Sequence, residues 1–372
     1  MIRELSKLTV HYRDRKVGTL AVAPSGNCVF QYDQEWLANG FSISPIKLPL
    51  ENKLFEAPST PFYGNFGVFA DSLPDGYGRY LLHKMLLQEG IDDFTLNPLQ
   101  RLSIVGSSGM GALCYVPETV VGISKELPSL DTLQQLADDI LNEKSLDNID
   151  ILYHNSGNSG GCRPKCLLNT DGESWLVKFR HTYDPKDMGQ TEYEYSLAAK
   201  ACGINMPETR LFEGKYFGVK RFDLHNGMRV HAITAAGLLD VDFRYPSLDY
   251  IALMQATGYL TKQQSQVEEM FRRMVFNVLT GNKDDHAKNF AFLYTDTGWT
   301  LSPAYDLTRS DEGYGGEHTT LINGKGLPDY SDMIEAGTRM RLPRKRCKEI
   351  FDQVHSGCRE IMLKKWINCS TT

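Results

Sequence analysis

Residues 280–290 read TGNKDDHAKNF, so that Asp284 precedes Asn289 by five positions. A hairpin pattern, two apolar runs around the turn TDTG, separates Asn289 from a second aspartate, Asp306, in the stretch PAYDL at 303–307. Phosphoryl transfer needs a carboxylate that positions the attacking hydroxyl, and an amide oxygen and a second carboxylate that hold magnesium. The order of these three residues therefore favours an enzyme that uses ATP.

On this pattern we predict that Asp284 is catalytic and that Asn289 and Asp306 bind Mg²⁺. An aspartate five residues before an asparagine also describes a capped turn in solvent. The hairpin and Asp306 favour the kinase interpretation. His286 lies inside the loop, and it either orients Asp284 or contacts phosphate, or it braces the loop through a hydrogen bond.

A helix is expected directly before this loop and should end at Gly281. Apolar residues recur there at steps of three and four, which is the pattern of a helix with one buried face. They are Val267, Met270, Phe271, Met274, Val275 and Val278. The charged residues between them, Glu268, Glu269, Arg272 and Arg273, are expected to face solvent.

A glycine-rich stretch at 156–165 reads SGNSGGCRPK. Glycines allow positive φ and close backbone approach, so Gly160 and Gly161 are predicted to direct N–H groups at ATP phosphates. The spacing is not that of a Walker A loop, and the alternative is a flexible connection. Ser156 and Ser159 would be within reach of a nearby γ-phosphate and are candidate autophosphorylation sites.

Lys178 lies in an apolar strand, WLVKF at 175–179, and a helix with Glu192 and Glu194 follows. This order is similar to the kinase lysine that binds the α- and β-phosphates and pairs with a helix glutamate. Lys165 is a rival for the same role.

The strand FGVKRFD at 217–223 joins the β-rich part of the chain to the helical part. Such a strand presents backbone groups to the adenine edge and apolar side chains to its faces. The residues predicted to contact the nucleotide here are Val219, Lys220 and Phe222.

The expected fold class is α+β, with a two-lobed protein-kinase-like fold and an additional N-terminal β-rich subdomain. The expected domains are an N-terminal subdomain at 1–120, a β-rich lobe with the glycine-rich loop at 121–225, and a helical lobe with the catalytic loop at 226–372. Strands are expected at 8–12, 16–22 and 29–32, and a hairpin around residues 169–172. Helices are expected at 73–90, from Asp131 with a capping box to Gln134, and at 192–202.

The 372 residues carry a net charge of -6 and give a pI of about 5.9, which argues against direct wrapping of nucleic acid. No signal-peptide core and no apolar run of about 20 residues appears, so we expect a cytoplasmic protein without a membrane span. The eight cysteines are scattered and are expected to be free thiols.

Together these stretches resemble the HipA family of serine/threonine kinase toxins of bacterial toxin–antitoxin systems. FADSLPD at 69–75 and GSSGMGAL at 106–113 resemble the family's N-terminal subdomain. The stretches that resemble its kinase core are SGGCRPK at 159–165, LVKF at 176–179, VKRFD at 219–223, DDHAKN at 284–289 and YD at 305–306.

The resemblance implies ATP and Mg²⁺ as cofactors and a HipB-like helix-turn-helix antitoxin as partner, through which DNA is contacted only indirectly. It implies a protein substrate such as an aminoacyl-tRNA synthetase. It assigns catalysis to Asp284, metal binding to Asn289 and Asp306, and the nucleotide lysine and its partner to Lys178 and Glu192. The family also inactivates itself by phosphorylating a serine in the glycine-rich loop. Here Asn158 stands where one such serine is expected, between Ser156 and Ser159.

Two other functions fit parts of the pattern. The loop DDHAKN is close to the Asp-Arg-His-x-x-Asn loop of phosphatidylinositol kinases, although no basic membrane-facing cluster accompanies it. The chain could also be a pseudokinase that binds a transcriptional repressor, but all the polar groups needed for transfer are present.

Overall fold

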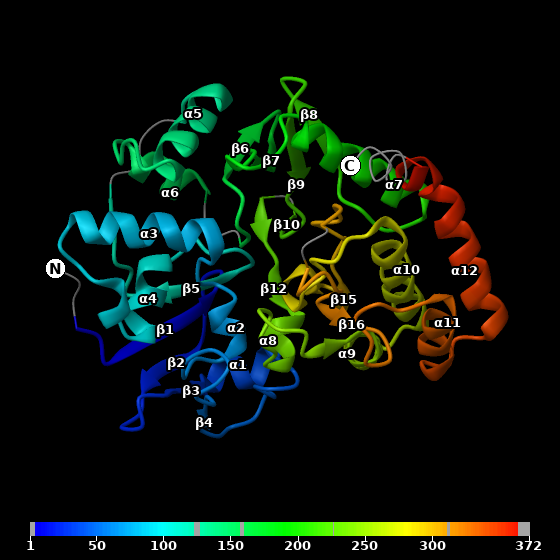
Figure 1. The fold of residues 1–372 in the computed structure, drawn as a ribbon. Helices are drawn as coiled ribbons and strands as arrows, with labels where there is room; N and C mark the ends of the chain where they lie inside the picture. Colours follow the sequence, from blue (N-terminus) through cyan, green and yellow to red (C-terminus); the bar gives the residue numbers. More distant parts are fainter. Residues whose placement is uncertain (1–3, 123–126, 157–159, 226, 311–312, 364–372) are drawn as a thin grey trace. The chain divides into compact units, whose positions relative to one another are not determined.

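A computed structural model describes residues 4–122, 127–156, 160–225, 227–310 and 313–363 (Figure 1). The chain divides into two compact units. The first contains Met1–Gly189, Arg210–Ile233 and Gly237–Asp240, and the second contains Gln190–Thr209, Thr234–Ala236 and Val241–Thr372.

A five-stranded antiparallel sheet, in the order β4-β3-β2-β1-β5, opens the first unit. Its strands are β1 (Lys7–Tyr12), β2 (Arg15–Val22), β3 (Cys28–Tyr32), β4 (Phe55–Glu56) and β5 (Leu113–Val116). The three expected N-terminal strands are confirmed. Alternating side chains are buried, and Val10, Leu20 and Phe30 are fully so.

The helices of the first unit lie partly on this sheet and partly away from it (Figure 1). They are α1 (Gln34–Asn39), α2 (Gly67–Ala70), α3 (Gly76–Gln88), the short 3₁₀ helix η1 (Asp93–Thr95), α4 (Pro98–Val105), α5 (Leu130–Leu141) and α6 (Ile149–Ser156). α3 follows Asp75 and ends before Gly90, as expected. The expected cap at Asp131 is wrong, because Ser129 accepts from the N–H of Thr132 and starts α5 one residue earlier.

The chain then forms a second sheet, with the strand order β6-β7-β9-β8. In this sheet β7 pairs antiparallel with both β6 and β9. The sheet contains β6 (Lys165–Thr170), β7 (Glu173–Lys178), β8 (Thr209–Phe212) and β9 (Tyr216–Lys220). The predicted hairpin turn is confirmed: Asp171 and Gly172 have φ of 56° and 75°, the two positive values that a tight two-residue turn requires. Trp175 and Val177 are fully buried, in one apolar cluster with residues of α3, α5 and α6.

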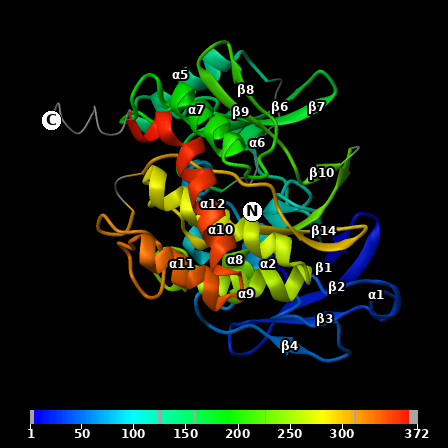
Figure 2. The same cartoon turned by 90° about the vertical axis from the view of Figure 1, so that its right-hand side faces the viewer.

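The remaining short elements are β10 (Leu224–His225), β11 (Met228–Arg229), β12 (His231–Thr234), α8 (Ala235–Leu239), β13 (Leu248–Asp249) and β16 (Thr320–Leu321). The long helices are α7 (Met188–Ala201), α9 (Tyr250–Thr261), α10 (Gln264–Thr280), α11 (Tyr330–Arg339) and α12 (Arg344–Gly357). Within the second unit α10 packs against α9, α11 and α12, and Figure 2 shows α12 alongside α10 and α11. In the described parts of the chain no helix is both long and apolar enough to span a membrane.

Two arginines of α10 correct the sequence prediction. Arg272 and Arg273 were expected in solvent, but their exposed fractions are 8% and 1%. Arg273 donates to Glu269 at 2.9 Å and to the backbone oxygen of Ser302 at 2.8 Å. The helix is therefore buried on more than its apolar face, because these hydrogen bonds compensate the guanidinium for the loss of water.

Candidate active site

The end of α10 positions the loop that carries Asp284. Gly281 adopts the left-handed conformation, with φ of 71°, and its N–H contacts the carbonyl oxygens of Asn277 and Val278. Glycine takes this conformation without steric cost and so ends a helix abruptly. The predicted end of the helix at Gly281 is confirmed, and the loop leaves from a buried, fixed point.

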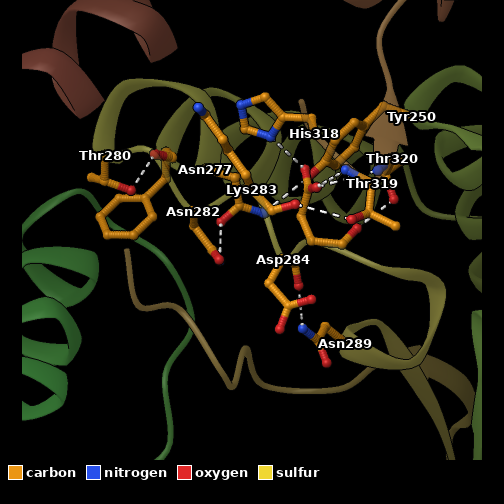
Figure 3. A network of polar contacts seen from close by, with 12 residues as sticks. Tyr250, Asn277, Thr280, Asn282, Lys283, Asp284, Asn289, His318, Thr319 and Thr320 are labelled. Carbon is orange, nitrogen blue, oxygen red and sulfur yellow. Dashed lines mark hydrogen bonds and ion pairs between the residues drawn. The ribbon is translucent and has the colours of Figure 1, made fainter. Parts of the chain in front are cut away.

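Two adjacent aspartates in this loop have opposite environments. Asp284 is exposed, with 54% of its side chain accessible, whereas Asp285 is fully buried. The carboxylate of Asp285 accepts hydrogen bonds from Tyr250 at 2.8 Å, His318 Nδ1 at 3.0 Å, and the backbone N–H groups of Thr319 and Thr320 at 2.9 and 3.2 Å. Figure 3 shows Asp284 apart from this cluster, with Asn289 beside it.

The cluster around Asp285 continues to Asp306. Asn277 donates to the hydroxyl oxygen of Tyr250 at 2.8 Å, and Asn282 donates to Asn277 at 3.0 Å. Asn282 also donates to the backbone oxygen of Asp306 at 3.2 Å. Burial, followed by the charge of Asp285, raises the pKa of Tyr250 well above its ordinary value, so Tyr250 remains a donor. One buried network thus fixes both the loop and the backbone of Asp306. Figure 3 shows the part of it formed by Tyr250, Asn277 and Asn282.

Asn289 is oriented by Asp284. Its side-chain Nδ2 donates to the backbone oxygen of Asp284 at 2.7 Å, and its own N–H donates to the backbone oxygen of His286 at 2.9 Å. It ends the short 3₁₀ helix η2 (Ala287–Asn289). Because the amide nitrogen is used internally, the amide oxygen Oδ1 is the atom directed away from the loop backbone.

Asp306 follows the expected hairpin, which consists of β14 (Ala291–Thr295) and β15 (Gly298–Leu301). Its φ is 53°, a left-handed value that is uncommon outside glycine and that aspartate tolerates better than most residues. The preceding residue, Tyr305, donates its hydroxyl to the backbone oxygen of Lys288 at 2.7 Å. A non-glycine residue held in this conformation is typical of functional sites.

His286 makes contacts on both sides of its ring. Nδ1 accepts from the N–H of Lys288 at 3.3 Å, which is the bracing interaction. Nε2 lies 3.9 Å from Oδ1 of Asp284, and the ring centroid lies 5.6 Å from that of Phe243. His286 therefore braces the loop through Nδ1 and also lies beside Asp284. A contact of His286 with phosphate stays a prediction.

The glycine-rich loop is described from Gly160 onward. The N–H of Gly161 donates to Oδ1 of Asp75 at 2.7 Å, and its carbonyl oxygen accepts from the N–H of Tyr77 at 3.0 Å. Gly161 has φ of 100°, so the predicted positive φ is present. The role of Gly160 and Gly161 in ATP binding stays a prediction.

The two candidate lysines occupy paired positions, since Lys165 of β6 is in register with Lys178 of β7. Lys165 is buried, and its Nζ donates to the backbone oxygen of Gly160. Lys178 is half-buried, and its Nζ lies 5.7 Å from the centroid of Phe217. Lys165 therefore supports the glycine-rich loop, and the role of Lys178 in binding the phosphates stays a prediction.

Glu192, the predicted partner of Lys178, is buried on α7, with an exposed fraction of 3%. Lys178 and Glu192 belong to different units, and their pairing stays a prediction.

The strand predicted to contact adenine forms β9 and the residues after it. Val219 is buried and Phe222 half-buried, while Lys220 pairs with Glu173 across the sheet. Asp223 ends the segment and accepts from Arg221 at 2.9 and 2.7 Å.

The two candidate autophosphorylation sites differ in what the structure describes. Ser156 is the last residue of α6, is 2% exposed, and donates to the backbone oxygen of Tyr153 at 3.2 Å. Phosphorylation there requires the end of α6 to open. Ser159 lies outside the described residues.

Sequence reasoning missed the residues that hold the site in place. Asp285 was part of the quoted motif, but no role was assigned to it, and Tyr250, Asn277 and Asn282 were not singled out. Asp75 was noted only within the stretch FADSLPD and near the start of the helix expected at 73–90. The pair of adjacent aspartates at 284–285 was the available signal for a second, structural role, because two adjacent side chains on one loop point in different directions.

The donor atoms of Asn289 and Asp306 match the ligand preference of the expected metal, Mg²⁺. Mg²⁺ prefers oxygen ligands and is usually held by one or two protein groups together with substrate phosphates. Asn289 directs an amide oxygen, and Asp306 supplies a carboxylate on a fixed backbone. These residues fit a magnesium–nucleotide complex.

Comparison with known proteins shows the family to which the chain belongs. The model of the HipA-like C-terminal domain matches residues 157–362, and that of the HipA N-terminal domain matches residues 8–116. The chain is 22% identical to the serine/threonine-protein kinase toxin HipA of Shewanella oneidensis, over 82% of this chain and 75% of that protein. It is 30% identical to the putative kinase Y4dM of Sinorhizobium fredii, in a match that covers 41% of this chain and 41% of that protein.

A solved structure shows the same fold. It is the Shewanella oneidensis MR-1 HipA, HipB and operator DNA complex, with a TM-score of 0.71 at 20% identity, covering 96% of this chain and 90% of that chain. The predicted class is confirmed: an α+β kinase-type fold with a HipA N-terminal domain. The chain belongs to the HipA family of serine/threonine protein kinases.

Proposed function

We propose that the chain is a HipA-like toxin that transfers the γ-phosphoryl group of ATP to a serine or threonine of a protein and so arrests growth. The observation that carries this proposal is the loop in which an exposed Asp284 lies beside an oriented Asn289. The next residue, Asp285, belongs to the buried network that also holds the backbone of Asp306. Phosphoryl transfer requires the protein to hold the catalytic carboxylate and the metal ligands in fixed positions.

In this proposal Asp284 accepts a hydrogen bond from the substrate hydroxyl and takes up its proton as the oxygen–phosphorus bond forms and the bond to ADP breaks. ATP with Mg²⁺ supplies the phosphoryl group and neutralises its charge. Asn289 and Asp306 hold the metal through oxygen atoms. His286 Nε2 lies 3.9 Å from Oδ1 of Asp284, and His286 is proposed to orient this carboxylate.

The other roles follow the family pattern. Lys178 is proposed to bind the α- and β-phosphates and to pair with Glu192, and the backbone around Val219 to contact adenine. The proposed domains are 1–120, 121–225 and 226–372. Autophosphorylation in the glycine-rich loop, at Ser159 or Ser156, is proposed to limit activity.

The proposed partner is a HipB-like antitoxin with a helix-turn-helix, which contacts operator DNA. Support comes from the related Shewanella oneidensis structure, which contains HipA, HipB and operator DNA. The net charge of -6 also fits indirect rather than direct DNA contact. A translation protein such as an aminoacyl-tRNA synthetase is the proposed substrate, and the bacterial cytoplasm the proposed site of action.

The test is incubation of the protein with γ-labelled ATP and Mg²⁺ in a bacterial lysate, followed by mass spectrometry of phosphosites. We expect label on serine or threonine, and a loss of at least about a hundredfold in Asp284→Ala and Asp306→Ala. Asp296→Ala is the matched control, since Asp296 is an exposed aspartate in the turn of the same hairpin.

Equal labelling by Asp306→Ala and wild type would contradict the proposal. Label on phosphatidylinositol in added liposomes, but on no protein, would replace it with a lipid kinase. Nucleotide binding without transfer, together with tight binding of a repressor, would replace it with a pseudokinase.

A further inference from the structure

The start of α3 and the glycine-rich loop form a reciprocal pair of hydrogen bonds. Asp75 accepts from the N–H of Gly161 at 2.7 Å, and two residues later the N–H of Tyr77 donates to the carbonyl oxygen of Gly161 at 3.0 Å. All three residues lie in the first unit, and Asp75 and Gly161 are 86 positions apart in sequence. The backbone N–H and the backbone carbonyl oxygen of Gly161 therefore both form hydrogen bonds at the N-terminus of α3.

Asp75 does not serve the purpose usual for its position. It is the N-cap of α3, where an aspartate normally accepts from an N–H of its own helix. No such bond is formed by its side chain. Instead its carboxylate binds the loop, and the loop carbonyl satisfies one N–H of the helix. The side chain of Asp75 therefore binds a distant segment of the chain and does not cap its own helix.

The fit between the two backbones leaves no room for side chains. A Cβ on Gly76 would lie 2.4 Å from the carbonyl oxygen of Gly161, and a Cβ on Gly160 would lie 2.9 Å from Oδ1 of Asp75. Gly76 also has φ of 46°, in the region that favours glycine. Position 76 therefore requires glycine where it meets the backbone of Gly161, whereas the atom close to Gly160 belongs to the side chain of Asp75.

Lys165 also holds the dipeptide 160–161. Its Nζ donates to the carbonyl oxygen of Gly160, and its side chain is 4% exposed at the start of β6. The dipeptide 160–161 is thus held by a carboxylate, a backbone N–H and a buried ammonium. Three such contacts fix the position at which the loop joins the sheet.

We propose that Asp75 is a positioning residue that anchors Gly161 of the glycine-rich loop, so that the described part of the loop, from Gly160 onward, is held in place before ATP binds. The proposal rests on the kinase function proposed above and extends it, because it makes the N-terminal HipA domain a part of nucleotide binding. Ordering a loop in advance lowers the entropy lost on binding. The N-terminal domain would then set the affinity for ATP without contacting it.

The test compares Asp75→Ala, Asp75→Asn and Gly76→Ala with wild type in the full chain. We expect Asp75→Ala to raise KM for ATP by about tenfold, with kcat changed by less than about twofold, since a hydrogen bond to a charged group that orders the loop is lost. Asp75→Asn keeps an acceptor oxygen and should restore most of the affinity. Gly76→Ala should resemble Asp75→Ala, because its Cβ displaces Gly161.

Hydrogen–deuterium exchange without nucleotide gives an independent readout. We expect faster exchange of the peptide that contains Gly161 in Asp75→Ala. The matched control is Asp92→Ala, which removes another aspartate cap in the same unit, that of η1, without a contact to the loop. Its KM and loop exchange should equal those of wild type.

An unchanged KM and unchanged exchange in Asp75→Ala would overturn the inference. A lowered KM would also overturn it, because it would mean that the carboxylate competes with phosphate for the N–H of Gly161. If wild type transfers no phosphoryl group, the proposed function fails, while the exchange experiment still decides whether Asp75 anchors the loop.

Discussion

Asn289 donates its side-chain N–H to the backbone oxygen of Asp284 at 2.7 Å, and this bond joins the two ends of the proposed catalytic loop. It gives the amide a fixed orientation, with nitrogen toward the loop and oxygen away from it. A residue proposed to bind metal and the backbone of the residue proposed to position the substrate are therefore coupled directly.

The coupling can be tested with Asn289→Asp. The substitution keeps an oxygen for the metal but places a carboxylate oxygen against the carbonyl oxygen of Asp284 in place of a donor. We expect kcat to fall by about tenfold to a hundredfold, and excess Mg²⁺ to restore only part of it. Steady-state kinetics over a range of Mg²⁺ concentrations measures this. Full recovery at high Mg²⁺ would show that Asn289 acts as a metal ligand alone.

Substitutions at the two adjacent aspartates should have different effects. The change at Asp285 should lower stability, whereas the change at Asp284 should lower activity and leave stability nearly unchanged. Asp285→Ala leaves Tyr250, His318 and two backbone N–H groups without their buried acceptor, so the free energy of unfolding should fall by about 3 kcal/mol or more. Asp284→Ala removes an exposed side chain and should change it by less than about 0.5 kcal/mol. Urea denaturation of both variants measures the difference, and equal losses would contradict the assignment.

Asp306 combines a proposed ligand with a left-handed backbone. Asp306→Asn should abolish phosphoryl transfer but unfold at nearly the wild-type temperature, because asparagine also tolerates φ of 53°. Asp306→Ala should lose activity and also about 1 kcal/mol of stability, because alanine does not. Thermal unfolding beside the labelling assay compares the two. Equal stability of the variants would argue against backbone strain at this position.

The buried side chain of His231 should make the free energy of unfolding depend on pH. It is fully buried, with Nε2 2.8 Å from the backbone oxygen of Ile43, and burial lowers its pKa from 6.5 to about 4. Between these values the unfolded chain binds a proton that the folded chain does not, so stability falls as pH drops, by about 1.4 kcal/mol per unit. Above pH 6.5 the contribution is constant.

Urea denaturation between pH 7 and pH 5 measures this slope. His231→Gln keeps an N–H donor but does not titrate, and it should be less stable than wild type at pH 7 yet lose less stability on acidification. The same slope in both proteins would assign the pH dependence to other groups.

Local features of the fold were predictable from the sequence. The hairpin at Asp171 and Gly172, the end of α10 at Gly281 and the hairpin before Asp306 all lie where the sequence indicates. Each depends on the conformational preference of one or two residues and on the alternation beside them. The start of α5 was misplaced because Ser129 and Asp131 are both good caps, and the choice depends on a single hydrogen bond.

The order of Asp284, Asn289, hairpin and Asp306 is determined by the sequence alone, because the spacing of these side chains is short and the turns between them are local. The tertiary structure decided which aspartate of the doublet is buried, that Arg273 lies inside, and that Asp75 binds a glycine 86 residues away. These outcomes depend on partners from distant segments, such as Tyr250, His318 and Ser302. A charged side chain can be buried only where such partners replace water, and their proximity is a property of the folded chain.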